Sequence, residues 1–333
     1  MTRLLPGLVL FLFLFLVPAS QRTTAEAYPG TKRVRLLNYP HCIQLENAST
    51  RVVLGHHHGG RVLVYEFNGK NALYLDPEER RWEPGGDNRS VPVSAGRFDI
   101  GPEKIIPRRD ALWRGTWQAE ITGARKARLT SIEDPATGTQ LVREFELAQT
   151  GSRLRCTQII RNISDQPTQW CHWSRTFAEG QGICIIPLSP TSRFPGHYVM
   201  YEPGNLINIS PQDPNIRIRQ GYLEILGAPQ YPKLGMDAQV GWFAYQMKND
   251  LVFLKKYRTE PDRVYNEVAG LTISIWYPDR PMCELEPIGP RESLEPGDTA
   301  SFTETWWLAE NAFPRAGEDL DLDAIASIAR KVR

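Results

Sequence analysis

Apolar and polar residues alternate in the manner of half-buried β-strands along most of the chain between Val34 and Leu308. The segment Arg61–Phe67 runs into Asn68-Gly69, which favours a two-residue hairpin turn because both residues accept positive φ. Residues 72–75 are the expected partner strand. Similar hairpins are predicted to pair 129–133 with 140–147 and 242–247 with 251–254, and a continuing meander is expected through 153–163 and 168–177.

Helical patterns are absent between these strands, which predicts an all-β protein built from two large stacked antiparallel sheets. Residues 76–107 and 186–215 are rich in glycine, proline or charge and are expected to be long ordered loops, a kind of loop that is usually functional. Residues 319–332 have apolar positions at helical spacing and basic residues in the last turn. They predict a short C-terminal helix.

The first 27 residues have the features of a signal peptide. Arg3 precedes the apolar run Leu8 to Val17, and Ala25-Glu26-Ala27 matches the small-x-small pattern at which such peptides are cleaved. The run is shorter than the roughly 20 residues that span a bilayer, so no stable membrane anchor is expected. We therefore predict a signal peptide at 1–27, a β domain at 28–313 and a helical tail at 314–333, exported to a periplasm or out of the cell.

Charge argues against some partners. Without Arg3, Arg22 and Glu26 the chain carries 37 basic and 37 acidic residues. A nucleic-acid-binding protein normally shows a clustered basic face that displaces counterions, so no nucleic acid is expected as a partner. Neutral polyhydroxylated ligands suit this balance better.

The cysteines and histidines of the chain are candidate metal ligands, and the cysteines are also candidates for disulfide bonds. Five widely spaced cysteines resemble neither a zinc site nor a small disulfide framework, and an odd number leaves at least one thiol without an intramolecular partner. Buried free cysteines are expected, although export permits a bridge or two. The run His56-His57-His58 lies among glycines and is interpreted as a loop lining a pocket. A metal role would need distant ligands, so neither a metal nor a cofactor is predicted.

The segment Met282–Pro290 is an apolar strand that carries carboxylates. Glu284 and Glu286 should share one face while Cys283 and Leu285 share the other, because side chains alternate along a strand. Two carboxylates on one surface can bind a sugar or move its protons. The alternative is that Glu286 is an edge-strand carboxylate in water.

A second candidate group lies at mid-chain. His172 alternates with Trp170, and this pair suits a sugar platform in which the indole packs on a pyranose and the imidazole makes a polar contact. The alternative is a hydrogen-bonded core histidine.

Several charged residues beside glycines or aromatics are further candidates for substrate binding. Arg61, Arg97 and Glu103 adjoin glycines, which allow close approach to a ligand, and Arg97 or Arg175 could fork onto a carboxylated sugar or vicinal hydroxyls. The alternative is a structural ion pair between Arg97 and Glu103 or Asp99.

Three short patches carry a family resemblance. They are 53–63 with its Gly-Gly-Arg, Gly96–Glu103, and Leu285-Glu286-Pro287 together with 294–297. With these patches the chain resembles the galactose mutarotase-like superfamily of aldose 1-epimerase relatives, and within it the bacterial DUF4380 family. The resemblance implies a β-supersandwich with a sugar site, for a mono- or oligosaccharide, on the concave face of a sheet.

The resemblance also implies roles for two residues. In epimerases of this fold a glutamate takes the proton of the anomeric hydroxyl while a histidine protonates the ring oxygen. Glu286 matches the position of the base, and His172 could stand where the acid does. The chain departs from the family at His172, because Ser174 and Arg175 follow Trp173 in place of the usual His-x-Tyr-Phe-Asn.

The sequence thus leaves three functions open. The first is an exported carbohydrate-binding protein with aldose 1-epimerase-like activity through Glu286 and His172, assisted by Arg61, Arg97, Glu103, Trp170, Arg175 and Glu284. The second is a non-catalytic sugar-binding or polysaccharide-processing accessory protein. The third is a structural envelope protein whose sheet packs against a partner.

Overall fold

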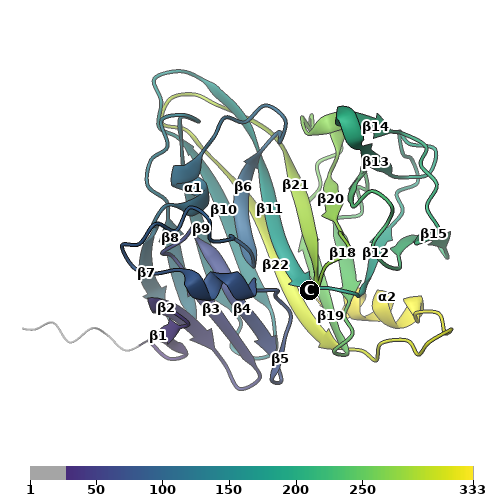
Figure 1. Cartoon of the computed structure of the whole chain (residues 1–333), viewed down its shortest axis with the longest axis horizontal. Coiled ribbons are helices and arrows are strands. Elements are labelled where there is room, and N and C mark those ends of the chain that lie inside the picture. Colours follow the sequence, from purple (N-terminus) through teal and green to yellow (C-terminus); the bar gives the residue numbers. More distant parts are fainter. Residues whose placement is uncertain (1–27, 333) are drawn as a thin grey trace, which may run out of the picture.

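The computed structural model describes residues 28–332, which form two large antiparallel sheets packed against each other (Figure 1). The all-β fold with a short C-terminal helix is therefore confirmed. The predicted signal peptide at 1–27 lies outside the described residues.

The first sheet has 12 strands, and neighbouring strands are antiparallel. In spatial order they are β1 (Thr31–Leu36), β2 (Tyr39–Glu46), β3 (Thr50–Gly55), β4 (Arg61–Phe67), β6 (Gly96–Gly101), β11 (Thr168–Glu179), β21 (Met282–Leu294), β20 (Ile273–Trp276), β17 (Lys233–Met236), β13 (Val199–Glu202) and β14 (Leu206–Asn208), while β5 (Lys70–Asn71) pairs with β4.

The second sheet has 10 strands, also antiparallel. Its order is β15 (Ile216–Arg219), β16 (Tyr222–Ile225), β12 (Ile183–Pro187), β18 (Trp242–Gln246), β19 (Leu251–Tyr257), β22 (Thr299–Glu310), β10 (Leu154–Asn162), β9 (Thr139–Leu147), β8 (Lys126–Thr130) and β7 (Gln118–Gly123).

Helices are short and peripheral. The expected C-terminal helix is α2 (Leu322–Lys331), which begins after Asp321, whose carboxylate accepts a hydrogen bond from the Ala324 N–H. Its apolar side packs on the outer face of the second sheet beside β12 and β18, as Figure 1 shows. The others are α1 (Asp110–Arg114) and the 3₁₀ turns η1 (Pro77–Arg81), η2 (Pro203–Asn205) and η3 (Val268–Gly270). No helix within 28–332 is long and apolar enough to cross a membrane.

The predicted hairpins are confirmed, except that the return strand of the first one is Lys70–Asn71 and not 72–75, and the predicted meander is wrong. Asn68 and Gly69 both have positive φ in the β4–β5 turn, and β8–β9 and β18–β19 pair as expected. By contrast, β10 pairs with β9 and β22 in the second sheet, whereas β11 pairs with β6 and β21 in the first. The connection at 163–167 therefore crosses between the sheets.

The segment expected to be one long loop at 76–107 contains η1 and the central strand β6, and 186–215 likewise contains β13 and β14. The glycines of β6 signal close packing. A Cβ on Gly96 would lie 2.9 Å from the Trp306 ring, and one on Gly101 would lie 2.7 Å from the Cys171 sulfur. Glycine is required here because the neighbouring side chains leave no room for a Cβ.

The largest hydrophobic cluster fills the space between the sheets, with members from both of them, such as Leu285 on β21 and Trp306 on β22. The space also holds buried charge: the Lys255 ammonium and the Glu304 carboxylate, both fully buried, lie 3.2 Å apart. The five cysteines are free and buried, as the sequence predicts.

Candidate functional site

The outer face of the first sheet carries a cluster of charged side chains, which we call the charged cluster. Its members are Arg97, Asp99, Glu103, Arg109, Arg175, Lys233, Glu284 and Glu286. Glu284 and Glu286 on β21 project to this face, while Cys283 and Leu285 between them point into the inter-sheet core. This is the arrangement that strand alternation predicts. Both carboxylates are fully buried.

Arg175 on the neighbouring strand β11 lies among the acidic groups. Its Nε donates to Glu284 Oε1 at 3.0 Å, and its guanidinium lies within 3.8 Å of carboxylate oxygens of Glu286, Asp99 and Glu103. A single guanidinium therefore links four carboxylates that come from two separate parts of the chain, 99–103 and 284–286. Its planar fork of donors suits this role better than the point charge of a lysine.

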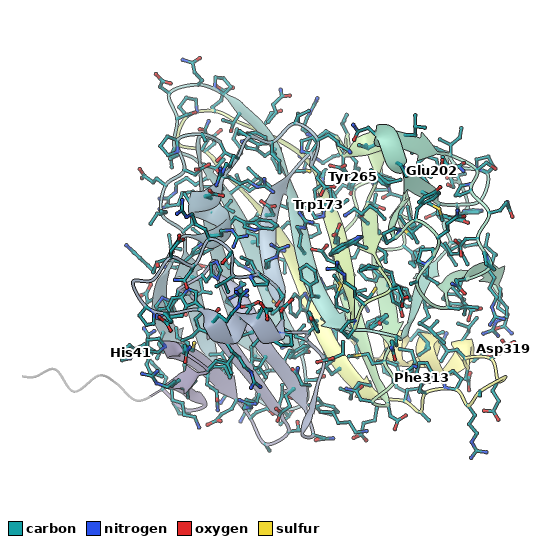
Figure 2. All side chains as sticks on the ribbon, in the orientation of Figure 1. His41, Trp173, Glu202, Tyr265, Phe313 and Asp319 are labelled. Carbon is teal, nitrogen blue, oxygen red and sulfur yellow. The ribbon has the colours of Figure 1, made fainter. Side chains whose placement is uncertain are left out.

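Glu286 is held from two sides. Lys233 on β17 places its Nζ 2.8 and 3.0 Å from the two carboxylate oxygens, and the Trp173 indole N–H donates to Oε2 at 2.9 Å. Figure 2 shows Trp173 in the middle of the molecule, where β11 and β21 run side by side. The carboxylate thus has a fixed orientation on the sheet.

Arg97 and Asp99 extend the charged cluster onto β6. Arg97 Nη2 lies 3.4 Å from Glu284 Oε1, and Asp99 pairs with Arg109, whose Nε donates to it at 2.7 Å. The Trp113 ring of α1 lies 3.6 Å from the guanidinium of Arg97. Helix α1 thus covers part of the cluster with an aromatic face that favours cations.

Only the rim of the charged cluster reaches solvent. The side chains of Glu103, Lys233 and Arg175 are 32%, 15% and 13% exposed. Glu103 is anchored by its own backbone N–H, which donates to Glu267 Oε2 at 2.8 Å. A ligand would approach the buried carboxylates past these three residues.

The pKa values of the two carboxylates of β21 are shifted in opposite directions. Burial raises the pKa of Glu286, and the neighbouring charge of Glu284 raises it further, so that together they outweigh Lys233 and Arg175. For Glu284 burial is overcome by Arg175, then by a hydrogen bond with Glu286 and by Arg97, and together these hold its pKa well below the usual range. Burial, reinforced by Arg175, lowers the pKa of Arg97 to about 9. Paired carboxylates whose pKa values are pushed apart are a common source of acid and base roles.

His172 is not part of this surface, which corrects the expectation that it converges with Glu286. Its fully buried ring points into the inter-sheet core, stacked between Phe98 and Phe302 at centroid distances of 5.8 Å each. Its Nε2 lies 3.2 Å from the carbonyl oxygen of Ala300, which requires the proton on Nε2 because a carbonyl only accepts. The alternative of a hydrogen-bonded core histidine describes this environment.

Trp170 and Arg61 also lie away from the charged cluster. Trp170 shares the inter-sheet side with His172, and its indole N–H donates to the carbonyl of Thr137, in the turn between β8 and β9 of the second sheet, at 3.2 Å. Arg61 is on the outer face but is buried in an ion pair with Glu79 at 2.7 Å and donates to the Ser94 carbonyl. It fastens the segment 76–95 to the sheet, so neither residue lies where a ligand of Glu286 would bind.

The sequence therefore identified Arg97, Glu103, Arg175, Glu284 and Glu286, which the fold brings together. It did not propose Arg109, Trp113, Trp173 or Lys233, and it named Asp99 only as an alternative ion-pair partner of Arg97, which in the structure pairs with Glu284. Asp99 had a signal, since it lies two residues from Arg97 and therefore on the same strand face. No feature of the sequence near Lys233 predicted its role, because only the strand order β21-β20-β17 places it beside Glu286. Among residues 28–332 no group of histidine, cysteine, aspartate and glutamate side chains is arranged to hold a metal ion.

The buried His172 leads to a pH prediction. Burial lowers its pKa to about 4, against 6.5 when exposed, so between these values the unfolded chain binds more protons than the folded one. Its contribution to stability is present above pH 6.5 and is lost as the pH falls towards 4, by about 3 kcal/mol. Denaturant unfolding measured between pH 7 and 4 should show a smaller decrease in the free energy of unfolding for His172→Phe than for the wild type. If the free energy of unfolding fell with pH equally in both proteins, His172 would not be the group responsible.

Comparisons with known proteins support the architecture. No protein-family model and no curated protein sequence matches the chain. Among solved structures, it is similar to a putative aldose 1-epimerase from Escherichia coli K12 with a TM-score of 0.58 at 11% identity, covering 80% of this chain and 98% of that one. It is also similar to a galactose mutarotase-like protein from Clostridium acetobutylicum with a TM-score of 0.56 at 11% identity, covering 85% and 99%. The expected likeness to the DUF4380 family stays a prediction. The two sheets, their long antiparallel strands and these neighbours together show that the chain has the galactose mutarotase-like fold.

Proposed function

We propose that this protein binds a carbohydrate on the outer face of its first sheet, at the charged cluster. The observation that carries the proposal is the convergence of Glu284, Glu286, Arg175 and Lys233 on that face, with a partly exposed rim. Sugar hydroxyls donate and accept hydrogen bonds, so they suit a surface on which carboxylates alternate with cations. Solved structures with the same fold include proteins described as a putative aldose 1-epimerase and as galactose mutarotase-like. Export by a signal peptide at 1–27 remains part of the proposal.

The raised pKa of Glu286 favours aldose 1-epimerase-like activity as a second candidate. A carboxylate with a pKa raised towards neutrality can take a proton from an anomeric hydroxyl and return it. The reaction also needs a proton donor at the ring oxygen, and His172 is not available for it. On this face Lys233 and Arg175 are the cations nearest to Glu286. Binding without catalysis is therefore the function that the geometry supports best.

Saturation-transfer NMR with α-glucose and α-galactose separates these possibilities. Transfer to the sugar protons is the result expected for binding, and faster α-to-β interconversion than in buffer is the result expected for an epimerase. If neither these sugars nor larger oligosaccharides receive transfer, carbohydrate binding at this surface is ruled out, and the alternative of a structural protein gains support.

Glu286→Gln tests the role of this carboxylate in catalysis. The amide keeps the shape of the side chain and removes the base, so interconversion should fall to the rate in buffer while sugar affinity changes by less than about threefold. Polarimetry measures the rate and titration calorimetry the affinity. Glu295→Gln, at an exposed position on the turn between β21 and β22, is the matched control. An equal loss of rate and affinity would make Glu286 a binding or folding residue.

A further inference from the structure

A separate cavity of about 420 Å³ lies beside residues 56–58, the connection between β3 and β4. Its volume is within the range of small-molecule sites. The segments around it are the loop at 82–89 and the residues that follow α1. The lining side chains that matter for its chemistry are those of His57, His58, Trp82, Asn88 and Arg114.

His58 lines this cavity with two unused hydrogen-bonding atoms. Its side chain is buried, at 2% exposure, yet neither Nδ1 nor Nε2 has a hydrogen-bond partner. The Nδ1 of His57 is likewise buried without a partner. Buried polar atoms in folded proteins are almost always satisfied by protein, ligand or ordered water, so this arrangement calls for an occupant of the cavity.

The histidines are held in place by their surroundings. The backbone of 56–59 accepts a hydrogen bond from Trp117 N–H at 2.6 Å and donates one to the carbonyl of Gly115 at 2.9 Å. The His57 ring packs 5.4 Å from the ring of Trp82, which in turn stacks 4.5 Å from that of Tyr39. A site held this rigidly loses little entropy on binding.

The charge around His58 selects among ligand types. Burial, with the nearby charges of Arg61, Arg114 and Arg97, lowers its pKa to about 3, so the imidazole is neutral. A neutral imidazole offers one N–H donor and one lone-pair acceptor. Arg61, Arg114 and Arg97 outnumber Glu79 near His58, and the lining residues Asp87 and Arg89 pair with each other, so a metal cation would be repelled. An anion would satisfy the donor and leave the lone pair unpaired. Two hydroxyl groups of one ligand can satisfy both, one accepting from the N–H and the other donating to the lone pair.

We propose that this cavity binds a hydroxyl-bearing unit, a sugar residue, at a second site distinct from the charged cluster. The inference deepens the proposed function and rests on it for the choice of a sugar. Arg97 lies between the two sites: its charge acts on His58, and its Nη2 is 3.4 Å from Glu284.

Histidine side-chain ¹⁵N NMR of the full chain, titrated with cellobiose, tests the proposal. The ring nitrogens of His58 are expected to shift as they gain partners, in the wild type and in Glu286→Gln alike. In the His58 variants the ring nitrogens of His57, which line the same cavity, report binding. His58→Gln keeps a donor and an acceptor and should retain cellobiose binding, whereas His58→Phe should weaken the affinity for cellobiose at this cavity by about tenfold or more. His57→Ala, at a half-buried position, gives a second test if His58→Phe does not fold.

Several outcomes would overturn the proposal. Unchanged His58 resonances at saturating cellobiose would mean that ordered water fills the cavity. A response to zinc chloride or inorganic phosphate without one to cellobiose would replace the sugar by a metal or an anion. The two proposals can also fail separately. If the His58 resonances shift with cellobiose but neither the wild type nor Glu286→Gln shows sugar contact at the charged cluster, sugar binding at the charged cluster is contradicted, whereas binding in the cavity beside His58 is supported.

Discussion

Replacing Lys255 with methionine is expected to lower the free energy of unfolding by about 3–5 kcal/mol. The Lys255 ammonium is fully buried between the sheets, pairs with Glu304 and donates to Thr176 Oγ1 at 2.8 Å and to the Leu285 carbonyl at 3.0 Å. Its removal leaves the Glu304 carboxylate buried without its counter-charge. Equilibrium denaturation in guanidinium chloride measures the loss.

The matched control is Lys126→Met on β8, because that side chain is half exposed and its carboxylate partner Glu146 is also in solvent. Exposed pairs contribute little, so a much smaller loss is expected there. Equal losses for the two variants would show that Lys255 is not a structural counter-charge. The Leu285 carbonyl lies between Glu284 and Glu286, so Lys255→Met should also weaken sugar binding at the charged cluster.

Replacing Arg175 with leucine is expected to have the second-largest effect, again about 3–5 kcal/mol of lost stability near neutral pH. Arg175 is the cation shared by Glu284, Glu286, Asp99 and Glu103, at distances of 3.0 to 3.8 Å. Without it, negative charges on one sheet face repel one another, and Glu284 loses its main hydrogen-bond donor. Sugar affinity should fall as well, because the orientation of Glu284 depends on this contact.

The pH dependence of the Arg175→Leu deficit distinguishes this cause from lost packing. Arg175 lowers the pKa of Glu284 in the folded protein, so its contribution is present above the unfolded pKa of that carboxyl and is lost as the pH falls. The deficit should therefore be constant between pH 8 and about pH 5 and should shrink as the pH falls below about 4.5, the ordinary pKa of a glutamate, so that it is larger at pH 7 than at pH 3. Arg175→Lys keeps the charge and should lie between wild type and leucine. A deficit that is constant or grows at low pH would indicate packing alone.

Local sequence predicted the hairpins because their determinants are local. Asn68-Gly69 accepts the positive φ that the β4–β5 turn requires, and the alternation along β21 placed Glu284 and Glu286 on one face. Strand β6 was hidden inside an expected loop. Its glycines have the composition of a turn, and only the side chains of neighbouring strands explain why they are needed in a strand.

The side of the sheet on which each candidate lies could not be predicted from alternation. His172 and Trp173 are adjacent and must face opposite ways, but alternation does not say which one faces the core. The structure puts His172 between Phe98 and Phe302 and puts Trp173 against Glu286. The family resemblance had suggested the opposite assignment for the histidine.

By itself, the sequence determined that this protein is built from antiparallel strands in two sheets, with a closing helix and a carboxylate-bearing strand near its end. These features depend on two-residue periodicity and turn chemistry, which act over a few neighbouring residues. Only the tertiary structure decided which charges meet. The order β6-β11-β21-β20-β17 brings together Asp99, Arg175, Glu286 and Lys233. That order depends on long-range strand pairing and on burial of one face of each strand, which no local pattern encodes.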